Sequence, residues 1–264
     1  MKREIADGSS IEYEKHGHGR TLVMLHAFPL SNEMWREQID KLGSEWKIIA
    51  PNARGIGESS AFSGAPSIEQ TAHDVADLLE ELRIAEPIYL CGLSMGGYAA
   101  LAFARLYPQR LGALILSDTK AAADNDEARA KRNDMIAFCR NHSADEIIER
   151  QIPALLGVTT CETRPQVIEK VRNISRVLDA QNLALWVEAL RDRPDATAQL
   201  AQIAVPTLVL CGDEDTITPP DESRAMAEAI PNAQLQIVPQ AGHLSNMENA
   251  LEWNKAVRTF LREL

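Results

Sequence analysis

Residues 87–107 have the sequence PIYLCGLSMGGYAALAFARLY and contain the most informative motif of the chain. It begins with a short apolar run, continues through Gly92-Leu93-Ser94-Met95-Gly96, and ends in a segment rich in residues that favour helices. A strand, a G-x-S-x-G turn and a helix in this order place a serine on a sharp turn, where the small glycines let neighbouring backbone pass closely. We expect this turn to expose the Ser94 hydroxyl at the N-terminus of the helix.

Other short apolar runs, on both sides of this stretch, predict a parallel sheet covered by helices. The predicted strands are Thr21–His26, Lys47–Pro51, Pro87–Cys91, Leu111–Ser117, Pro206–Cys211 and Gln234–Val238. Each is short and mostly apolar, so we expect each to be buried on both faces. The segment from Ser67 to Arg83 carries apolar residues three and four positions apart, which predicts a helix. An Asp7-Gly8 turn between Lys2–Ala6 and Ser10–Glu14 predicts an antiparallel hairpin.

The alternation of strands and helices stops between about residues 120 and 200, where the sequence is charged and helical. We therefore expect two parts: a core of residues 1–119 and 201–264, and a helical cap, residues 120–200, inserted between two strands. In open α/β sheets ligands bind at the carboxyl ends of the strands, and an insertion at this point can cover them as a lid. The alternative is a helical layer that merely extends the core.

Composition and charge argue against several classes of protein. The 264 residues include 27 Lys and Arg against 38 Asp and Glu, a formal net charge of −11, and no basic patch that could bind nucleic acid. No apolar run is long enough for a membrane span, and the N-terminus lacks the apolar region of a secretory signal, so we expect a cytoplasmic protein. The cysteines stand singly and no metal-binding or nucleotide-binding motif is present, so we expect no metal and no cofactor.

Two later loops contain the partners that a serine nucleophile needs. A serine hydroxyl attacks efficiently only beside a general base that a carboxylate orients. The segments Gly212–Pro219, with three adjacent acids, and Gln240–Leu244, with His243, each follow a predicted strand. We assign His243 as the base and favour Asp215 as its carboxylate partner. The alternative acid is Asp118, at the end of another predicted strand.

The intermediate of acyl transfer carries an oxyanion that needs two N–H donors. One comes from the residue after the nucleophile, Met95, and the other from the loop after an earlier strand, for which Phe28 is the best candidate. These donors belong to the backbone, so the two side chains matter mainly for the shape of the site. His26 closes the strand beside this loop, and we expect it to support the loop rather than act as the base.

These segments together resemble the α/β-hydrolase superfamily over essentially the whole chain. In that superfamily's order they are HAFPL (26–30), RGIGES (54–59), GLSMGG (92–97), GDEDTITPP (212–220) and AGHLSNMEN (241–249). The resemblance implies an eight-stranded, mostly parallel sheet flanked by helices, with an inserted helical cap. It also implies a triad of Ser94, Asp215 and His243. The oxyanion donors would be Phe28 and Met95.

Within the superfamily the chain is similar to small carboxylesterases and to 3-oxoadipate enol-lactonases. Ala27 departs from the commonest pattern, in which glycine follows the histidine, but enol-lactonase-like sequences share this His-Ala pair. Asn52 stands where many relatives have aspartate, and no function follows from the sequence. Serine at the turn argues against haloalkane dehalogenases and epoxide hydrolases, which use aspartate there.

These features predict a serine carboxyl-ester hydrolase that acts on small esters of short acyl chain through an acyl-enzyme. Its partner would be a small-molecule ester or lactone, with no nucleic acid and no membrane. The alternatives are a 3-oxoadipate-type enol-lactonase, a triad-retaining ligand receptor on the same fold and, with less support, a cofactor-free perhydrolase. An enol-lactonase would need a basic residue for the substrate carboxylate, and the nearby candidates are Lys120 and Arg129.

Overall fold

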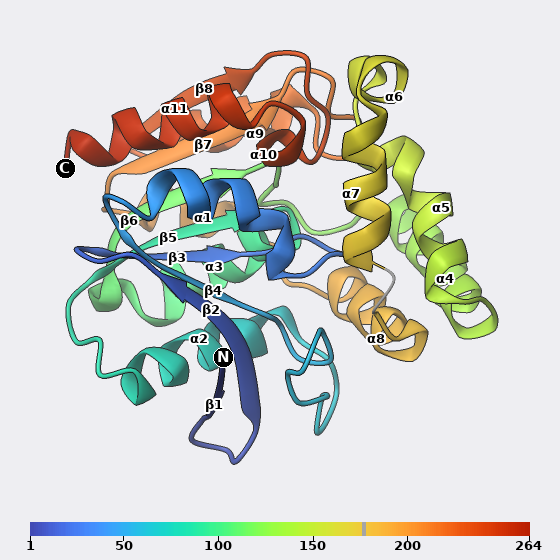
Figure 1. Cartoon of the computed structure of the whole chain (residues 1–264), viewed down its shortest axis with the longest axis horizontal. Helices are drawn as coiled ribbons and strands as arrows, with labels where there is room; N and C mark the ends of the chain where they lie inside the picture. The colour runs from blue at the N-terminus through green and yellow to red at the C-terminus, as the bar shows by residue number, and fades with distance from the viewer. Residues whose placement is uncertain (176–177) are drawn as a thin grey trace.

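The computed structural model describes residues 1–175 and 178–264. Among these residues, eight strands form one sheet in the order β1-β2-β4-β3-β5-β6-β7-β8 (Figure 1). Strands β3 to β8 pair in parallel, whereas β2 is antiparallel to both β1 and β4. The predicted α/β fold with a mostly parallel eight-stranded sheet is therefore confirmed.

The strands lie within two residues of their predicted positions. They are β1 (Lys2–Glu4), β2 (Ser10–His16), β3 (Thr21–Leu25), β4 (Lys47–Pro51), β5 (Ile88–Leu93), β6 (Leu111–Ser117), β7 (Thr207–Gly212) and β8 (Ala233–Val238). One expectation was wrong, because β8 is not buried on both faces and exposes Gln234 and Gln236. This strand is the last in the sheet order, and its glutamines alternate with apolar residues.

Helices cover both faces of the sheet, and alternate strand residues point into two hydrophobic cores (Figure 1). The helices outside the expected insertion are η1 (Asn32–Trp35), α1 (Arg36–Leu42), α2 (Ile68–Glu81), α3 (Met95–Leu106), η2 (Pro108–Arg110), α9 (Pro220–Ala229), α10 (Ser245–Glu248) and α11 (Ala250–Arg262). Helices α1 and α11 pack on one core, and α2, α3 and α9 on the other. The helix predicted from Ser67 is α2, and the Ser67 side chain caps it by accepting the Glu69 N–H.

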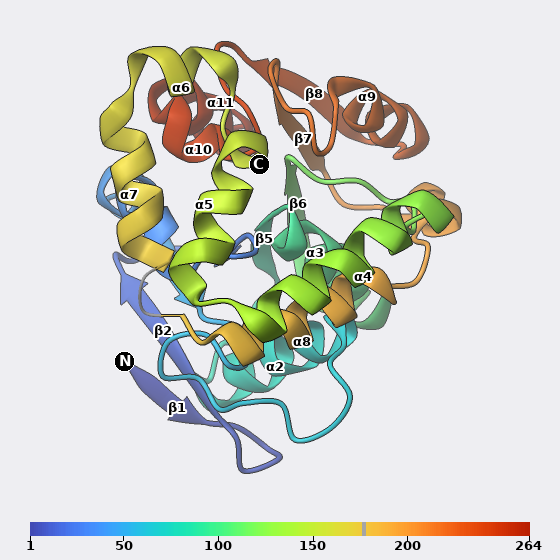
Figure 2. The same cartoon turned by 90° about the vertical axis from the view of Figure 1, so that its right-hand side faces the viewer.

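Between β6 and β7 the described chain is helical. The helices are α4 (Asp126–Asn141), α5 (Ala144–Leu155), α6 (Val158–Thr163), α7 (Pro165–Ser175), α8 (Ala180–Arg191) and η3 (Thr197–Gln202). Helices α4 to α8 gather at one end of the strands, on the right in Figure 1, and Figure 2 turns this side toward the viewer. Residues 176 and 177 of the expected insertion lie outside the described residues. Within the described ranges, every helix is too short or too polar to cross a bilayer.

The segments that enter and leave this helical region are bonded to each other. The Ala196 N–H donates to the Ala121 carbonyl at 2.9 Å. A buried ion pair of 2.8 Å between Arg193 and Asp124 joins the same segments. The Arg193 guanidinium also lies over the ring of Tyr98 in α3, 4.3 Å from the ring centroid. The two connections therefore lie side by side and pack against α3.

A pair of buried tryptophans anchors α11 to the sheet. The ring centroids of Trp35 and Trp253 lie 5.6 Å apart, and both residues are fully buried. The Trp253 indole Nε1 donates to the Ser117 hydroxyl at 3.0 Å, at the end of β6. Aromatic pairs of this kind add to the stabilisation that comes from burying their area.

We expect Trp253→Ala to lower the free energy of unfolding by about 3–5 kcal/mol, because truncation of a buried aromatic side chain leaves a cavity. Leu251→Ala changes the same helix at a residue that is 76% exposed, and it should cost less than about 0.5 kcal/mol. Urea denaturation followed by far-ultraviolet circular dichroism measures both variants. A loss in Trp253→Ala no larger than that in Leu251→Ala would contradict the anchoring role.

Candidate active site

Ser94 lies in the sharp turn between β5 and α3. Its backbone has φ 53° and ψ −112°, a conformation that residues with side chains rarely adopt. The Ser94 N–H donates to the Ser117 carbonyl in β6 at 2.9 Å. The Thr119 hydroxyl donates to the Ser94 carbonyl, also at 2.9 Å. Hydrogen bonds on both sides therefore hold the turn, which presents the serine at the start of α3.

Two glycines allow this turn to form. A Cβ atom at Gly92 would lie 2.1 Å from the carbonyl oxygen of Gly96. A Cβ atom at Gly96 would lie 2.1 Å from the carbonyl oxygen of Leu25 in β3. Because backbone atoms cannot yield to such contacts, both positions require glycine. This confirms the expectation that neighbouring backbone passes closely at the turn.

His243 connects the serine to a carboxylate. Its Nε2 lies 2.7 Å from Ser94 Oγ, and its Nδ1 lies 2.8 Å from Asp215 Oδ2. The three residues follow the carboxyl ends of β5, β7 and β8, so the sheet brings them together from distant parts of the sequence. With Nδ1–H donated to the carboxylate, the Nε2 lone pair faces the serine hydroxyl. The structure thus places together the three residues that the sequence selected.

The carboxylate of Asp215 is buried but has many donors. Oδ1 accepts the N–H groups of Ile217 at 2.8 Å and Thr218 at 3.0 Å, and Oδ2 accepts the Thr218 hydroxyl at 2.7 Å. Burial favours the neutral acid, but the His243 imidazole and these donors outweigh it and lower the pKa of Asp215. Burial also opposes a charge on His243, and the Asp215 carboxylate outweighs it, so the pKa of His243 is raised.

Each of the three adjacent acids in this loop has a separate partner. Asp215 accepts from the imidazole. Asp213 Oδ1 accepts the Ala241 N–H at 3.2 Å, which joins the loop to the histidine loop. Glu214 accepts the N–H of Thr159 at 2.8 Å and also its hydroxyl, which joins the loop to the start of α6. The acid that contacts the imidazole is Asp215, the one that the sequence favoured, and its two neighbours bond to other segments.

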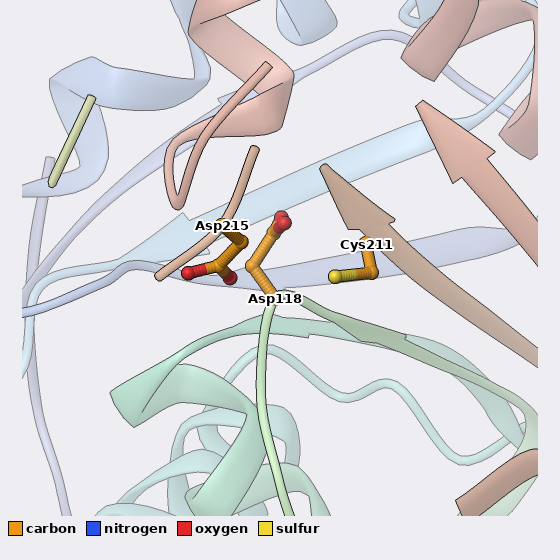
Figure 3. Close-up of side chains that lie close together, drawn as sticks. All are labelled: Asp118, Cys211 and Asp215. Atoms are coloured by element: carbon orange, nitrogen blue, oxygen red, sulfur yellow. The ribbon is translucent and has the colours of Figure 1, made fainter. Parts of the chain in front are cut away.

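Asp118, the alternative acid, lies near Asp215 but bonds to other groups (Figure 3). Its carboxylate accepts the Gly212 N–H at 2.8 Å, the Ser117 hydroxyl at 2.7 Å and the Ser245 hydroxyl. Burial, together with the nearby Asp215 carboxylate, raises the pKa of Asp118 to about 7. Asp118 therefore ties together the ends of strands that carry the site, while Asp215 contacts the imidazole.

Asp118, Cys211 and Asp215 also offer potential metal ligands within 4.8 Å of one another. Both oxygens of each carboxylate already accept hydrogen bonds from protein donors. Burial raises the pKa of the Cys211 thiol, which keeps it protonated, whereas metal ligation needs the thiolate. The chemistry of these donors therefore fits a hydrogen-bonded cluster rather than a metal site.

The two expected oxyanion donors lie at the carboxyl ends of neighbouring strands. Met95 is the first residue of α3, where N–H groups have no acceptor within the helix. Phe28 lies in the loop after β3, the neighbour of β5 in the sheet. Both backbones are thus close in the fold to the turn of Ser94.

His26 supports the loop of Phe28, as expected. Its Nε2 accepts the Ala53 N–H at 3.0 Å, so the proton is on Nδ1, which lies 3.0 Å from the Ala27 carbonyl and donates to it. The ring is fully buried, and this burial lowers the pKa of His26 to about 4. His26 is therefore a neutral structural residue that fixes two loops beside the site.

Two polar residues without a role in the sequence analysis make several contacts. Asn52 donates to Glu12 at 2.8 Å and accepts the Asn32 N–H at 2.7 Å, so it joins three segments of the core. Glu248 is almost completely buried and follows His243 by five residues. The available signal for Glu248 was its place in the segment AGHLSNMEN, close to His243.

The fold is that of a known family of proteins. The sequence pattern of the family described as alpha/beta hydrolase fold matches residues 20–250, and the chain belongs to this family. A thermophilic esterase from Thermogutta terrifontis, solved with malate bound, is 38% identical with a TM-score of 0.94, and the match covers 100% of this chain and 98% of that one.

Two lactonases are also similar to this chain. The enol-lactonase from Burkholderia xenovorans LB400 is 27% identical with a TM-score of 0.91, covering 99% of this chain and 100% of that one. The 3-oxoadipate enol-lactonase 2 of Acinetobacter baylyi is 27% identical over 241 residues, 91% of this chain and 88% of that protein. The family and these relatives support hydrolase activity.

The neutral state of His26 makes stability depend on pH. Its pKa is about 4 in the folded chain and 6.5 in a free imidazole, so unfolding takes up a proton between these values. The contribution of His26 to stability is complete above about pH 6.5, is lost as the pH falls toward 4, and amounts to about 3 kcal/mol. Urea denaturation at several pH values should show the stability difference between wild type and His26→Gln shrinking by about that amount. A difference that stayed constant from pH 7 to 4 would refute this role.

Proposed function

We propose that this protein is a serine carboxyl-ester hydrolase that acts on small esters of short acyl chain through an acyl-enzyme. The observation that carries the proposal is the continuous set of hydrogen bonds from Ser94 Oγ through His243 to Asp215. The similarity to the Thermogutta terrifontis esterase supports the same chemistry. The proposed location is the cytoplasm, and the proposed reaction needs neither metal nor cofactor.

In the proposed reaction Ser94 Oγ attacks the acyl carbon while His243 Nε2 takes the hydroxyl proton. Asp215 holds the imidazolium that forms. The N–H groups of Phe28 and Met95 stabilise the oxyanion of the tetrahedral intermediate. His243 then gives its proton to the oxygen of the leaving alcohol, and the acyl-enzyme remains. Water attacks this ester with His243 again as base, and the acid leaves as the serine hydroxyl is restored.

A lactone is an internal ester, so the same steps would open it, and the enol-lactonase relatives support this second candidate. The basic residues considered for a substrate carboxylate are already engaged. The Lys120 ammonium lies 3.9 Å from a carboxylate oxygen of Asp124. The Arg129 guanidinium donates to the Arg191 carbonyl at 2.6 Å and to the Asp192 carboxylate at 2.8 Å. Simple esters therefore remain the first proposal, and a triad-retaining receptor would be distinguished by slow turnover.

We also propose that residues 1–119 and 201–264 form the core, and that residues 120–200 form a cap that selects the substrate. Contacts between α8 and the core support a fixed position of the cap on the core. The Trp186 indole donates to the Arg54 carbonyl at 2.8 Å. A Cβ atom at Gly55 would lie 2.8 Å from the Asn182 side chain, so helix and loop are in close contact.

Hydrolysis of p-nitrophenyl esters from acetate to decanoate tests the proposal. We expect turnover to be fastest for the short acyl chains. Ser94→Ala should lower kcat by at least about 10³-fold without unfolding the protein, because the attacking oxygen is lost. Circular dichroism shows whether the variant is folded. A folded variant with most of the wild-type activity would sink the assignment of the nucleophile.

The choice of Asp215 among its neighbours can be tested with adjacent substitutions. Asp215→Asn should lower kcat by about 10³–10⁴-fold, because an amide cannot hold the imidazole in the required tautomer. Asp213→Asn retains an oxygen that can accept the Ala241 N–H and should change kcat less than about threefold. Comparable losses in the two variants would argue against Asp215 as the acid. If Asp118→Asn lowered kcat by about 10³–10⁴-fold while Asp215→Asn stayed active, the acid of the triad would be Asp118.

A further inference from the structure

We propose that Glu248 is a positioning residue that couples the start of α6 to the backbone on both sides of His243. This inference rests on the proposed function, because it concerns the geometry of the same imidazole. Glu248 ends α10, and the residue is only 5% exposed. A buried carboxylate is costly unless donors surround it, so its partners indicate what it holds.

The carboxylate of Glu248 accepts three backbone N–H groups from two parts of the chain. Oε1 accepts those of Gly242 at 2.9 Å and Leu244 at 3.1 Å, the residues immediately before and after His243. Oε2 accepts the N–H of Gly157 at 2.8 Å, at the N-cap of α6. One side chain therefore holds the histidine loop and the start of α6 together.

The backbones of Gly157 and Gly242 touch without intervening side chains. A Cβ atom at Gly242 would lie 2.2 Å from the backbone nitrogen of Gly157. A Cβ atom at Gly157 would lie 2.8 Å from the backbone nitrogen of Gly242 and 2.3 Å from Glu214 Oε2. Since the contact leaves no space, a shift of the start of α6 toward the core would displace the histidine loop.

Further hydrogen bonds hold α6 in the same place. Glu214, in the loop that carries the proposed triad acid, accepts the N–H of Thr159 at 2.8 Å. Arg164, which follows α6, donates to the carbonyls of Gln240 and Glu248, each at 2.9 Å. Helix α6 is thus bonded at both ends to the loops that carry the base and its acid.

The Glu248 carboxylate also acts on the imidazole through its charge. Among the described residues, other charged or titratable groups near Glu248 and His243 include Asp118, Asp215, Glu214, Arg164 and Cys161. Burial opposes a charge on the imidazole, and the carboxylates of Asp215, Asp118 and Glu248 together raise the pKa of His243. Removal of one of these charges should therefore make the imidazolium less stable.

Glu248→Gln removes the charge while it conserves the size of the side chain. We expect kcat at the pH optimum to fall about tenfold with KM changed less than threefold, because the imidazole is less well placed. The acid limb of the kcat profile should move to lower pH by about half a unit. A merely structural role would reduce stability and leave the acid limb in place. Glu252→Gln, at a partly exposed position in α11, is the matched control and should change neither quantity.

Gly157→Ala is the second variant, because it keeps every charge and adds a methyl group to the contact. We expect it to lower kcat with little change in the acid limb, which separates position from charge. Unchanged kcat in folded Gly157→Ala would overturn the coupling through α6.

Titration of the His243 ring by NMR needs no substrate and separates the two proposals. A lower pKa of His243 in Glu248→Gln supports the role of Glu248 beside the imidazole, and if the wild type then hydrolyses no ester, the proposed function alone fails. An unchanged pKa of His243 together with an unchanged acid limb overturns the role of Glu248, while ester hydrolysis that Ser94→Ala abolishes leaves the proposed function intact.

Discussion

The packing around Ser94 holds its backbone at a positive φ, and the arrangement of the site follows from this conformation. Such a backbone costs about 1–3 kcal/mol and persists only where surrounding structure holds it. Here β3, β5, β6 and α3 meet around the turn, with Gly92 and Gly96 in contacts that exclude any side chain. The placement of the hydroxyl beside His243, and of the first N–H groups of α3 behind it, follows from this packing.

Three buried carboxylates lie around one imidazole, and their hydrogen-bond donors give them different properties. Asp215 receives backbone and hydroxyl donors as well as the imidazole, and its pKa is lowered. Burial raises the pKa of Asp118 to about 7 and also raises that of Glu248. Of the three acids, Asp215 therefore most strongly favours the ionised form, and its carboxylate is the one that contacts Nδ1 of His243 and would stabilise an imidazolium there.

Features that depend on local pattern could be predicted from the sequence, and features that depend on distant contacts could not. The strands, the turn of Ser94 and the two loops carry their signals within a few residues. The exposed face of β8 had a local signal, the alternation of Gln234 and Gln236 with apolar residues, but its place at the end of the sheet order depends on the whole fold. Asp215 and its acidic neighbours share one local signal; the resemblance favoured Asp215, and the separate partners of Asp213 and Glu214 follow only from three-dimensional contacts. Glu248 escaped notice because its partner Gly157 is 91 positions away in the sequence.

The bonded connections at Ala121 and Ala196 have a consequence for how such proteins diversify. When the ends of an inserted segment are already held together, a change in its length adds little to the entropy of closing the loop. Insertions or deletions in the middle of α4 can then be absorbed without moving β6 or β7, whereas Trp186 and Asn182 hold α8 against the loop of Arg54 and Gly55. The start of α6 is different, because a length change there would pull on the histidine loop. Changes of length should therefore be tolerated more readily in α4 than at the start of α6.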